Sequence, residues 1–143
     1  MGCNRRDRGV KAPKILLDTN MLMLIADGIN IFEQVEEKLA IKPQYIILKP
    51  VLKELEKLAN SDKPSIKRKA LFALRIVRKY CEIVDVEDYS KDVDEILIEY
   101  AQKHNAAVAT NDRELRRKLR AKGIPEIYLR EESMRIDIEG LEV

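Results

Sequence analysis

The sequence predicts an α/β fold in which a mainly parallel central sheet is covered by helices on both faces. Short apolar runs, of the kind found in strands buried on both faces, recur along the chain. Between them lie longer segments whose apolar residues have helical spacing, and alternating strands and helices build parallel sheets because each crossover helix lies on a sheet face. The 143 residues, 45% of them hydrophobic, are enough for the core of one such domain.

The first half of the chain is expected to hold two strands and three helices. The predicted strands are residues 14–17 and 45–48, both short and apolar. A short buried helix and an amphipathic helix are expected after the first strand, and a third helix after Pro50, which should interrupt the second strand. The predicted helices cover residues 21–25, 31–39 and 51–60.

The second half continues the alternation of strands and helices. A long basic helix is expected over residues 66–80, with apolar side chains directed inward. The inward side chains are Leu71, Leu74, Ile76 and Val77. The remaining predicted elements are strands at 81–84, 106–109 and 127–129, helices from Val93 and from Arg113 to Gly123, and an acidic tail.

Charge is segregated along the chain, although its net value is only +2. Residues 1–14 carry five basic side chains against one acid, residues 62–80 seven against one, and residues 113–122 six against one. Residues 82–99, in contrast, hold eight acids and one base. Basic helical faces also keep small proteins soluble, but three basic blocks together favour a polyanionic partner such as nucleic acid.

The composition argues against several classes of protein. No apolar run approaches the roughly 20 residues of a membrane helix, so we expect a cytoplasmic protein. A flexible basic arm is expected at residues 1–13, followed by one domain at residues 14–143. Cys3 and Cys81 suggest neither disulfides nor a thiolate metal site. The single histidine, His104, gives little support to a zinc hydrolase or a histidine-based triad. Any catalysis must therefore rely on carboxylates.

Two predicted strands end in similar polar clusters. The first strand is followed at once by Asp18 in an Asp-Thr-Asn run, and the strand at 106–109 by a Thr-Asn-Asp run that ends in Asp112. Sites in parallel sheets lie at the carboxyl ends of strands, so both carboxylates stand where a site is expected. Each is also a good helix N-cap, and this structural role explains either one alone. Capping does not explain why two such clusters occur together with two further acids, each near the start of another helix.

Glu54 and Asp94 are these further acids, near the starts of the helices at 51–60 and from Val93. A helix that follows a strand begins at the carboxyl edge of the sheet, so all four acids can converge. Asp92 is the alternative to Asp94 if the helix start is displaced. Clustered carboxylates repel one another unless a cation joins them, and a ligand set of oxygens selects Mg²⁺ or Mn²⁺. Such a cation supports phosphodiester hydrolysis without a histidine base.

Two other phosphate chemistries are disfavoured. A haloacid-dehalogenase phosphatase needs a second Asp two positions after its nucleophile, and Asn20 occupies that position. No Gly-rich phosphate loop with a Gly-Lys-Ser/Thr ending occurs, which argues against a P-loop nucleotide hydrolase. Hydrolysis of a nucleotide is therefore disfavoured.

Four ordered motifs resemble those of PIN-domain nucleases. They are Ile-Leu-Leu-Asp-Thr-Asn at residues 15–20, Val-Leu-Lys-Glu-Leu at 51–55, Val-Asp-Glu-Ile-Leu at 93–97 and Val-Ala-Thr-Asn-Asp-Arg-Glu-Leu at 108–115. The last motif, with the basic residues after it, is most similar to the archaeal relatives of the eukaryotic small-subunit processome PIN nuclease, which acts in rRNA maturation. The resemblance extends over nearly the whole chain beyond the arm.

The resemblance implies a three-layer α/β/α sandwich, Mg²⁺ or Mn²⁺ as cofactor, cleavage of single-stranded RNA and frequent homodimers. The family's four acidic metal ligands fall on Asp18, Glu54, Asp94 and Asp112. Its supporting polar residue falls on Thr110 or Asn111, and Thr19 and Asn20 are expected to support the site beside Asp18.

Three roles stay open for the chain. It is expected to process rRNA with ribosome-assembly partners, or to be the ribonuclease toxin of a toxin–antitoxin pair, because toxin members share the same acids. A third interpretation is a PIN module that binds RNA without cutting it, which the intact acids argue against. In each case the basic blocks should contact RNA, through Arg5, Arg6, Arg8, Lys67, Arg68, Arg116, Arg117 and Arg120.

Overall fold

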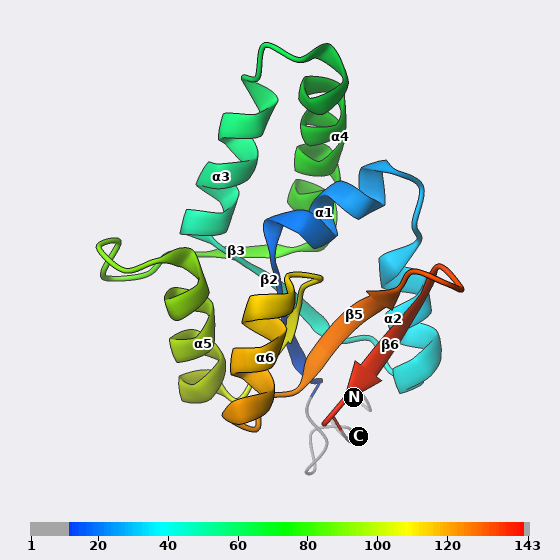
Figure 1. The fold of residues 1–143 in the computed structure, drawn as a ribbon, viewed down its shortest axis with the longest axis vertical. Helices are drawn as coiled ribbons and strands as arrows, with labels where there is room; N and C mark the ends of the chain where they lie inside the picture. Colours follow the sequence, from blue (N-terminus) through cyan, green and yellow to red (C-terminus); the bar gives the residue numbers. More distant parts are fainter. Residues whose placement is uncertain (1–11, 142–143) are drawn as a thin grey trace, which may run out of the picture.

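The computed structural model describes residues 12–141, which contain one six-stranded sheet (Figure 1). The strands are β1 (Lys14–Leu17), β2 (Gln44–Leu48), β3 (Glu82–Val84), β4 (Ala107–Ala109), β5 (Glu126–Arg130) and β6 (Arg135–Glu139). Their order across the sheet is β3-β2-β1-β4-β5-β6. All neighbours pair in parallel except β5 and β6, which confirms the expected mainly parallel sheet.

The strand order reverses beside β1. Strands β2 and β3 lie on one side of β1, whereas β4, β5 and β6 lie on the other. The switch in strand order therefore falls between β1 and β4, where Leu17 pairs with Ala109 at the carboxyl ends. Ligands of open parallel sheets bind beyond the carboxyl ends of the strands at such a switch. The residues that follow Leu17 and Ala109 thus stand at the most favourable position for a site.

Six helices of the described region form the outer layers of a three-layer α/β/α sandwich (Figure 1). They are α1 (Thr19–Ala26), α2 (Ile31–Leu39), α3 (Lys49–Ala59), α4 (Pro64–Tyr80), α5 (Val93–His104) and α6 (Arg113–Ala121). Helices α3 and α4 run side by side as a pair that extends beyond the sheet, and α1 packs against both (Figure 1). None of the helices in this region is long and apolar enough to cross a membrane.

Helices α1, α3 and α4 each begin two residues earlier than the sequence predicts, and for α3 and α4 the reason is that proline is tolerated in a first helical turn. Helix α3 starts at Lys49 rather than Val51 and carries Pro50 in its first turn. Helix α4 likewise starts early, at Pro64. Proline lacks the backbone N–H that this turn leaves unbonded in any case, and its fixed φ suits a helix. The earlier start of α3 places Glu54 in the second helical turn.

The core lies on both faces of the central strands. Apart from Lys14 and Gln44, with which β1 and β2 begin, the side chains of β1, β2 and β4 are buried, as expected for strands covered on both faces. Apolar side chains from all six helices and from β5 and β6 join them in one cluster. Strand β3 differs from the predicted burial, because as an edge strand it leaves Glu82 and Ile83 exposed.

The predicted acidic tail is wrong, because residues 135–139 form strand β6. This strand pairs with β5 in antiparallel register, and the backbone N–H of Ile136 donates to Oε1 of buried Gln34 on α2 at 2.7 Å. Ile136 and Ile138 pack on the core and alternate with charged residues. This is the pattern of an antiparallel strand with one packed face.

Helix α4 departs from its predicted burial. Leu71, expected inward, is 45% exposed, and the neighbouring Phe72 is 42% exposed. Alanines allow α4 to lie close to α3 and α1, and the two larger side chains are turned toward solvent. The buried α4 side chains are Ala70, Ala73, Leu74 and Val77.

Candidate active site

Four acidic side chains from four parts of the chain line one cavity of about 430 Å³. Asp18 follows β1 and Asp112 precedes α6, whereas Glu54 lies in the second turn of α3 and Asp94 in the first turn of α5. The cavity thus brings together all four acids that the sequence predicts, beyond the carboxyl ends of β1 and β4. The other polar residues that line it are Thr19 and Asn20.

Asp18 is the most buried of the four acids, with 7% of its surface exposed. It is the N-cap of α1, where Oδ1 accepts from the backbone N–H of Thr19 at 2.8 Å. Oδ2 accepts from the Thr110 hydroxyl at 2.8 Å and from Nδ2 of Asn20 at 3.2 Å. Burial raises the pKa of the Asp18 carboxyl above its usual 3.8, and the hydrogen bonds from Thr110 and Thr19 oppose that rise.

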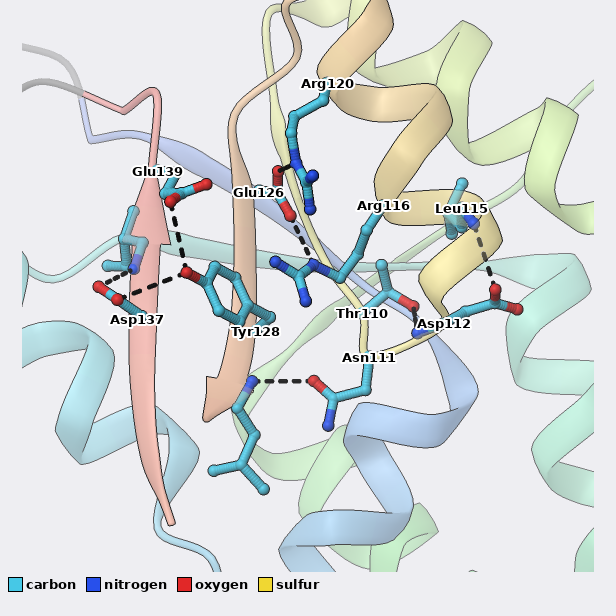
Figure 2. Close-up of polar contacts among 12 residues, drawn as sticks. Thr110, Asn111, Asp112, Leu115, Arg116, Arg120, Glu126, Tyr128, Asp137 and Glu139 are labelled. Carbon is cyan, nitrogen blue, oxygen red and sulfur yellow. Dashed lines mark hydrogen bonds and ion pairs between the residues drawn. The ribbon is translucent and has the colours of Figure 1, made fainter. Parts of the chain in front are cut away.

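Hydrogen bonds tie together the polar clusters that follow β1 and β4. The Thr110 hydroxyl donates to Asp18 and accepts from the backbone N–H of Asp112 at 3.1 Å. Oδ1 of Asn20 accepts from the backbone N–H of Asn111 at 3.0 Å. Oδ1 of Asn111 in turn accepts from a backbone N–H of β5 at 2.8 Å (Figure 2). These contacts fix the positions of Asp18 and Asp112 relative to three adjacent strands.

Glu54 is exposed, yet it meets the residue that follows Asp18. Its Oε1 accepts from the hydroxyl of Thr19 at 2.7 Å. Because Thr19 opens α1, this bond joins the second turn of α3 to the first turn of α1. Glu54 therefore reaches the cavity from farther along its helix than the sequence predicts.

Asp94 is half-buried in the first turn of α5. Burial is the main cause that raises the pKa of its carboxyl above the usual 3.8. Repulsion from Asp112 and Glu54 raises this pKa further, whereas the positive charge of Lys118 lowers it. The alternative acid Asp92 is the N-cap of α5 and is not among the side chains that line the cavity.

Asp112 is exposed and is the N-cap of α6. Its Oδ1 accepts from the backbone N–H of Leu115 at 3.2 Å (Figure 2) and from the backbone N–H of Glu114 at 2.9 Å. These capping bonds use one carboxylate oxygen and leave Oδ2 outside them. Asp112 therefore combines the structural role that the sequence allows with a place in the cavity.

The lining of the cavity fits a hard cation. Residues 12–141 hold no group of three or more His, Cys, Asp or Glu side chains already gathered as metal ligands. The charged groups of the lining are nevertheless carboxylates alone, and Mg²⁺ is commonly bound through one or two carboxylates while it keeps several waters. Burial and, to a smaller extent, the neighbouring carboxylates raise the pKa values of Asp18 and Asp94, so a cation in the cavity would stabilise their charged forms.

The sequence alone does not identify the apolar wall of the cavity, which consists of Met23, Leu58 and Val93. Helical spacing could have predicted two of them. Met23 lies one turn after Thr19 and Leu58 one turn after Glu54, so each lies on the same helix face as a polar residue of the cavity. Apolar neighbours of this kind exclude water, so the wall contributes to the desolvation of the carboxylates.

Two of the arginines expected to contact RNA pair with a buried acid. Glu126 on β5 is 1% exposed, and its two carboxylate oxygens pair with Nε of Arg116 at 2.6 Å and with Nε of Arg120 at 2.8 Å (Figure 2). The Arg116 guanidinium also lies 3.6 Å from the centroid of the Tyr128 ring. Arg116 and Arg120 therefore hold α6 on the sheet.

The other expected RNA contacts have different surroundings. Arg117 is exposed and pairs with Glu114, one turn before it, at 2.6 Å. Lys67 and Arg68 are exposed on α4. Arg5, Arg6 and Arg8 belong to the part of the predicted arm, residues 1–11, that lies outside the described residues.

Comparison with protein families agrees with this arrangement. Residues 15–132, which include all four acids of the cavity, match the family model described as a PIN like domain. The chain belongs to the PIN-like domain family. The family expected from the four sequence motifs is thereby confirmed.

This PIN-like domain is similar to two archaeal proteins over most of their lengths. It is 35% identical over 138 residues to Ribonuclease VapC9 of Archaeoglobus fulgidus, which covers 96% of this chain and 97% of that protein. It is 34% identical over 121 residues to Ribonuclease VapC4 of Methanocaldococcus jannaschii, which covers 82% of this chain and 91% of that protein.

The fold of this PIN-like domain is also found in a solved nuclease structure. The structure of the PIN domain endonuclease Utp24 superposes with a TM-score of 0.73 at 26% identity. The superposition covers 90% of this chain and 92% of that one. The three-layer sandwich that the motifs imply is therefore confirmed.

Proposed function

We propose that this PIN-like domain is a metal-dependent endoribonuclease that hydrolyses phosphodiester bonds of single-stranded RNA at the four-acid cavity. The observation that carries the proposal is the convergence of four acids, from elements far apart in the sequence, on one cavity at the switch in strand order. Helix capping accounts for Asp18 and Asp112. Capping gives no reason for Glu54 and Asp94 to face the same cavity.

The relatives support the same reaction. Two of them are named ribonucleases and the third is called a PIN domain endonuclease. Both archaeal ribonucleases align with this chain over most of their own length, so the similarity includes the region of the cavity rather than a peripheral part.

In this proposal, the carboxylates of Asp18, Glu54, Asp94 and Asp112 hold Mg²⁺ or Mn²⁺. Such an ion polarises a phosphate and lowers the pKa of a bound water. Thr110 and Asn20 orient one oxygen of Asp18, and Thr19 orients Glu54, so these three residues support the charged groups.

Cleavage of a single-stranded RNA by the purified protein, in Mn²⁺ and in EDTA, tests the proposal. Asp112→Asn is the decisive variant, because Asn caps helices about as well as Asp while a charged ligand is lost. We expect wild-type cleavage in Mn²⁺ only, and no cleavage by Asp112→Asn at an unchanged melting temperature.

The matched control is Glu114→Gln, which neutralises an exposed acid of the same helix that does not line the cavity. Glu114→Gln should cleave RNA as the wild type does. Cleavage in EDTA, or cleavage by folded Asp112→Asn, would contradict the proposal.

Two biological roles remain as proposals for this ribonuclease. The VapC relatives, at 35% and 34% identity, support a toxin with an antitoxin partner. The motif resemblance to the processome nuclease supports rRNA processing with ribosome-assembly partners. Controlled expression distinguishes the roles, because a toxin should arrest growth when wild type is expressed and not when Asp112→Asn is. Loss of a processing nuclease should instead cause unprocessed rRNA to accumulate.

A further inference from the structure

Helix α4 carries a second hollow, of about 410 Å³, that is separate from the four-acid cavity. We call it the α4 hollow. Its charged residues are all basic, and Phe72 provides its only aromatic ring. The residues that line it are Ala26, Ser65, Arg68, Lys69, Phe72 and Arg75.

The ring of Phe72 is available for contact with a ligand. The side chain is 42% exposed, since smaller residues of α4 form the buried stripe of the helix. The Arg75 guanidinium lies 5.9 Å from the ring centroid, at the outer limit of a cation–π contact. An exposed ring beside a guanidinium offers a surface on which another flat group can stack.

The positive charge of the α4 hollow is largely uncompensated. Lys69 pairs with Asp27 at 2.7 Å, but no ion pair of Arg68 or Arg75 occurs within residues 12–141. Arg68 lies one helical turn before Phe72, and Arg75 lies one turn after it. The ring is therefore flanked by two guanidinium groups that attract anions.

We propose that the α4 hollow binds an unpaired base of single-stranded RNA on Phe72 and the adjacent phosphates on Arg68 and Arg75. Sites for single-stranded nucleic acid combine these two features, because bases stack on aromatic rings while cations follow the backbone. An acidic polypeptide would use the arginines but has no need of the ring. The choice of RNA as ligand rests on the proposed function, whereas the placement of base and phosphates rests on the hollow itself.

Helix α1 connects the α4 hollow with the four-acid cavity. Met23 lines the cavity and Ala26 lines the hollow, and residues three apart lie on the same face of a helix. From Asp18 at the N-cap to Ala26, α1 spans about 12 Å at 1.5 Å per residue. At about 3.4 Å per stacked nucleotide, this length of α1 corresponds to roughly four nucleotides. One RNA strand can therefore occupy both places.

Binding of a single-stranded RNA of about 12 nucleotides, measured by fluorescence anisotropy in EDTA, tests this proposal without any cleavage. Phe72→Leu keeps an apolar side chain but removes the ring, so we expect Kd to rise about tenfold, within the usual range for base stacking on an aromatic side chain. Phe72→Tyr should keep the wild-type affinity. The matched control is Leu71→Ala, because Leu71 is 45% exposed on the same helix but does not line the hollow.

An RNA backbone of the same length without bases separates stacking from charge. The effect of Phe72→Leu should vanish on this abasic strand, whereas Arg68→Gln and Arg75→Gln should weaken the binding of both strands. Arg78→Gln, on α4 but outside the hollow, should weaken binding less.

Three results would overturn the proposal. They are wild-type affinity in Phe72→Leu, an equal loss in Leu71→Ala, and an effect of Phe72→Leu that persists on abasic RNA. Binding of polyglutamate that depends on Arg68 and Arg75 and is as tight as that of the RNA would also overturn it, in favour of an acidic protein partner.

The failure of this proposal and the failure of the proposed function give different results. If RNA is not cut in Mn²⁺ while binding still depends on Phe72, the endoribonuclease function fails and the α4 hollow stands. If Mn²⁺-dependent cleavage occurs while Phe72→Leu binds RNA as the wild type does, only the α4 hollow fails.

Discussion

The four acids of the cavity form two pairs with different secondary roles. Asp18 and Asp112 each cap a helix through one carboxylate oxygen, so helix formation itself fixes their positions. Glu54 and Asp94 do not cap their helices. For Asp94, burial and the neighbouring carboxylates raise the pKa, so its charge destabilises the metal-free fold.

Asp94→Asn is therefore expected to increase the free energy of unfolding of the metal-free protein at neutral pH. The pKa of Asp94 in the folded protein lies above its usual 3.8, so the fold favours the protonated acid. This contribution to the free energy of unfolding is fully present below pH 3.8. It is lost as the pH rises through the pKa of the folded protein. At higher pH the wild type must keep a desolvated charge that Asn does not carry.

Urea unfolding in EDTA measures this effect. The variant should be more stable than the wild type at neutral pH and should have no advantage below pH 3.8. An Asp94→Asn protein that is less stable at neutral pH would show that the carboxylate makes a favourable contact in the fold.

At the residue scale, the identities of the acids could be predicted from the sequence, but their surroundings could not. Asp18 and Asp112 are recognisable because apolar runs end directly before Asp18 and shortly before Asp112. The bond between Thr19 and Glu54 joins residues on two different helices, and helical spacing within either helix contains no sign of it.

At the scale of elements, the apolar strands could be predicted to within one or two residues, and the charged strand could not. Strands β1, β2 and β4 are buried on both faces, so they appear as continuous apolar runs. Strand β6 has one packed face and alternates isoleucine with charged residues, which resembles an acidic tail when its partner β5 is unknown. The predicted starts of α3 and α4 lie later in the chain than the observed starts, because a proline can either interrupt a strand or open a helix.

The attachment of α6 to β5 provides a prediction at this scale. Glu126→Gln should lower the free energy of unfolding by about 1.5–3 kcal/mol, the usual contribution of hydrogen bonds to charged groups. The physical reason is that a buried carboxylate neutralises Arg116 and Arg120 together. Urea unfolding near neutral pH measures the change.

Glu114→Gln is the control for this prediction. It removes the pair with Arg117, whose side chains are both exposed, and should lower the free energy of unfolding by less than about 1 kcal/mol. Equal losses in the two variants would show that the pairing of Glu126 with two arginines does not hold α6 on the sheet.

At the scale of the whole molecule, the basic blocks of the sequence have different uses in the fold. In the block at residues 113–122, Arg116 and Arg120 bind Glu126, whereas the block on α4 keeps Lys67 and Arg68 exposed. A count of charges along the chain cannot distinguish these uses, because Glu126 belongs to a different element. The exposure of Phe72 has the same origin, since the packing of α4 against α1 and α3 decides which apolar side chains are buried.

Replacing both Lys67 and Arg68 with Gln should weaken RNA binding and reduce its dependence on salt. Each phosphate contact on a single strand contributes about −0.7 to the slope of log affinity against log salt, so the slope should become shallower by up to about 1.4. Affinity for Mn²⁺ should not change, because neither residue lines the four-acid cavity. An unchanged slope would show that this part of α4 does not contact RNA.

The central claim is that Asp18, Glu54, Asp94 and Asp112 form one cation site, and calorimetric titration with Mn²⁺ tests it most directly. The wild type should bind Mn²⁺ saturably, and each of Asp18→Asn, Glu54→Gln, Asp94→Asn and Asp112→Asn should weaken binding by about tenfold or more, since even residues behind metal ligands have effects of that size. Glu114→Gln should bind Mn²⁺ as the wild type does. Wild-type Mn²⁺ affinity in a folded Asp18→Asn or Asp94→Asn protein would contradict the claim.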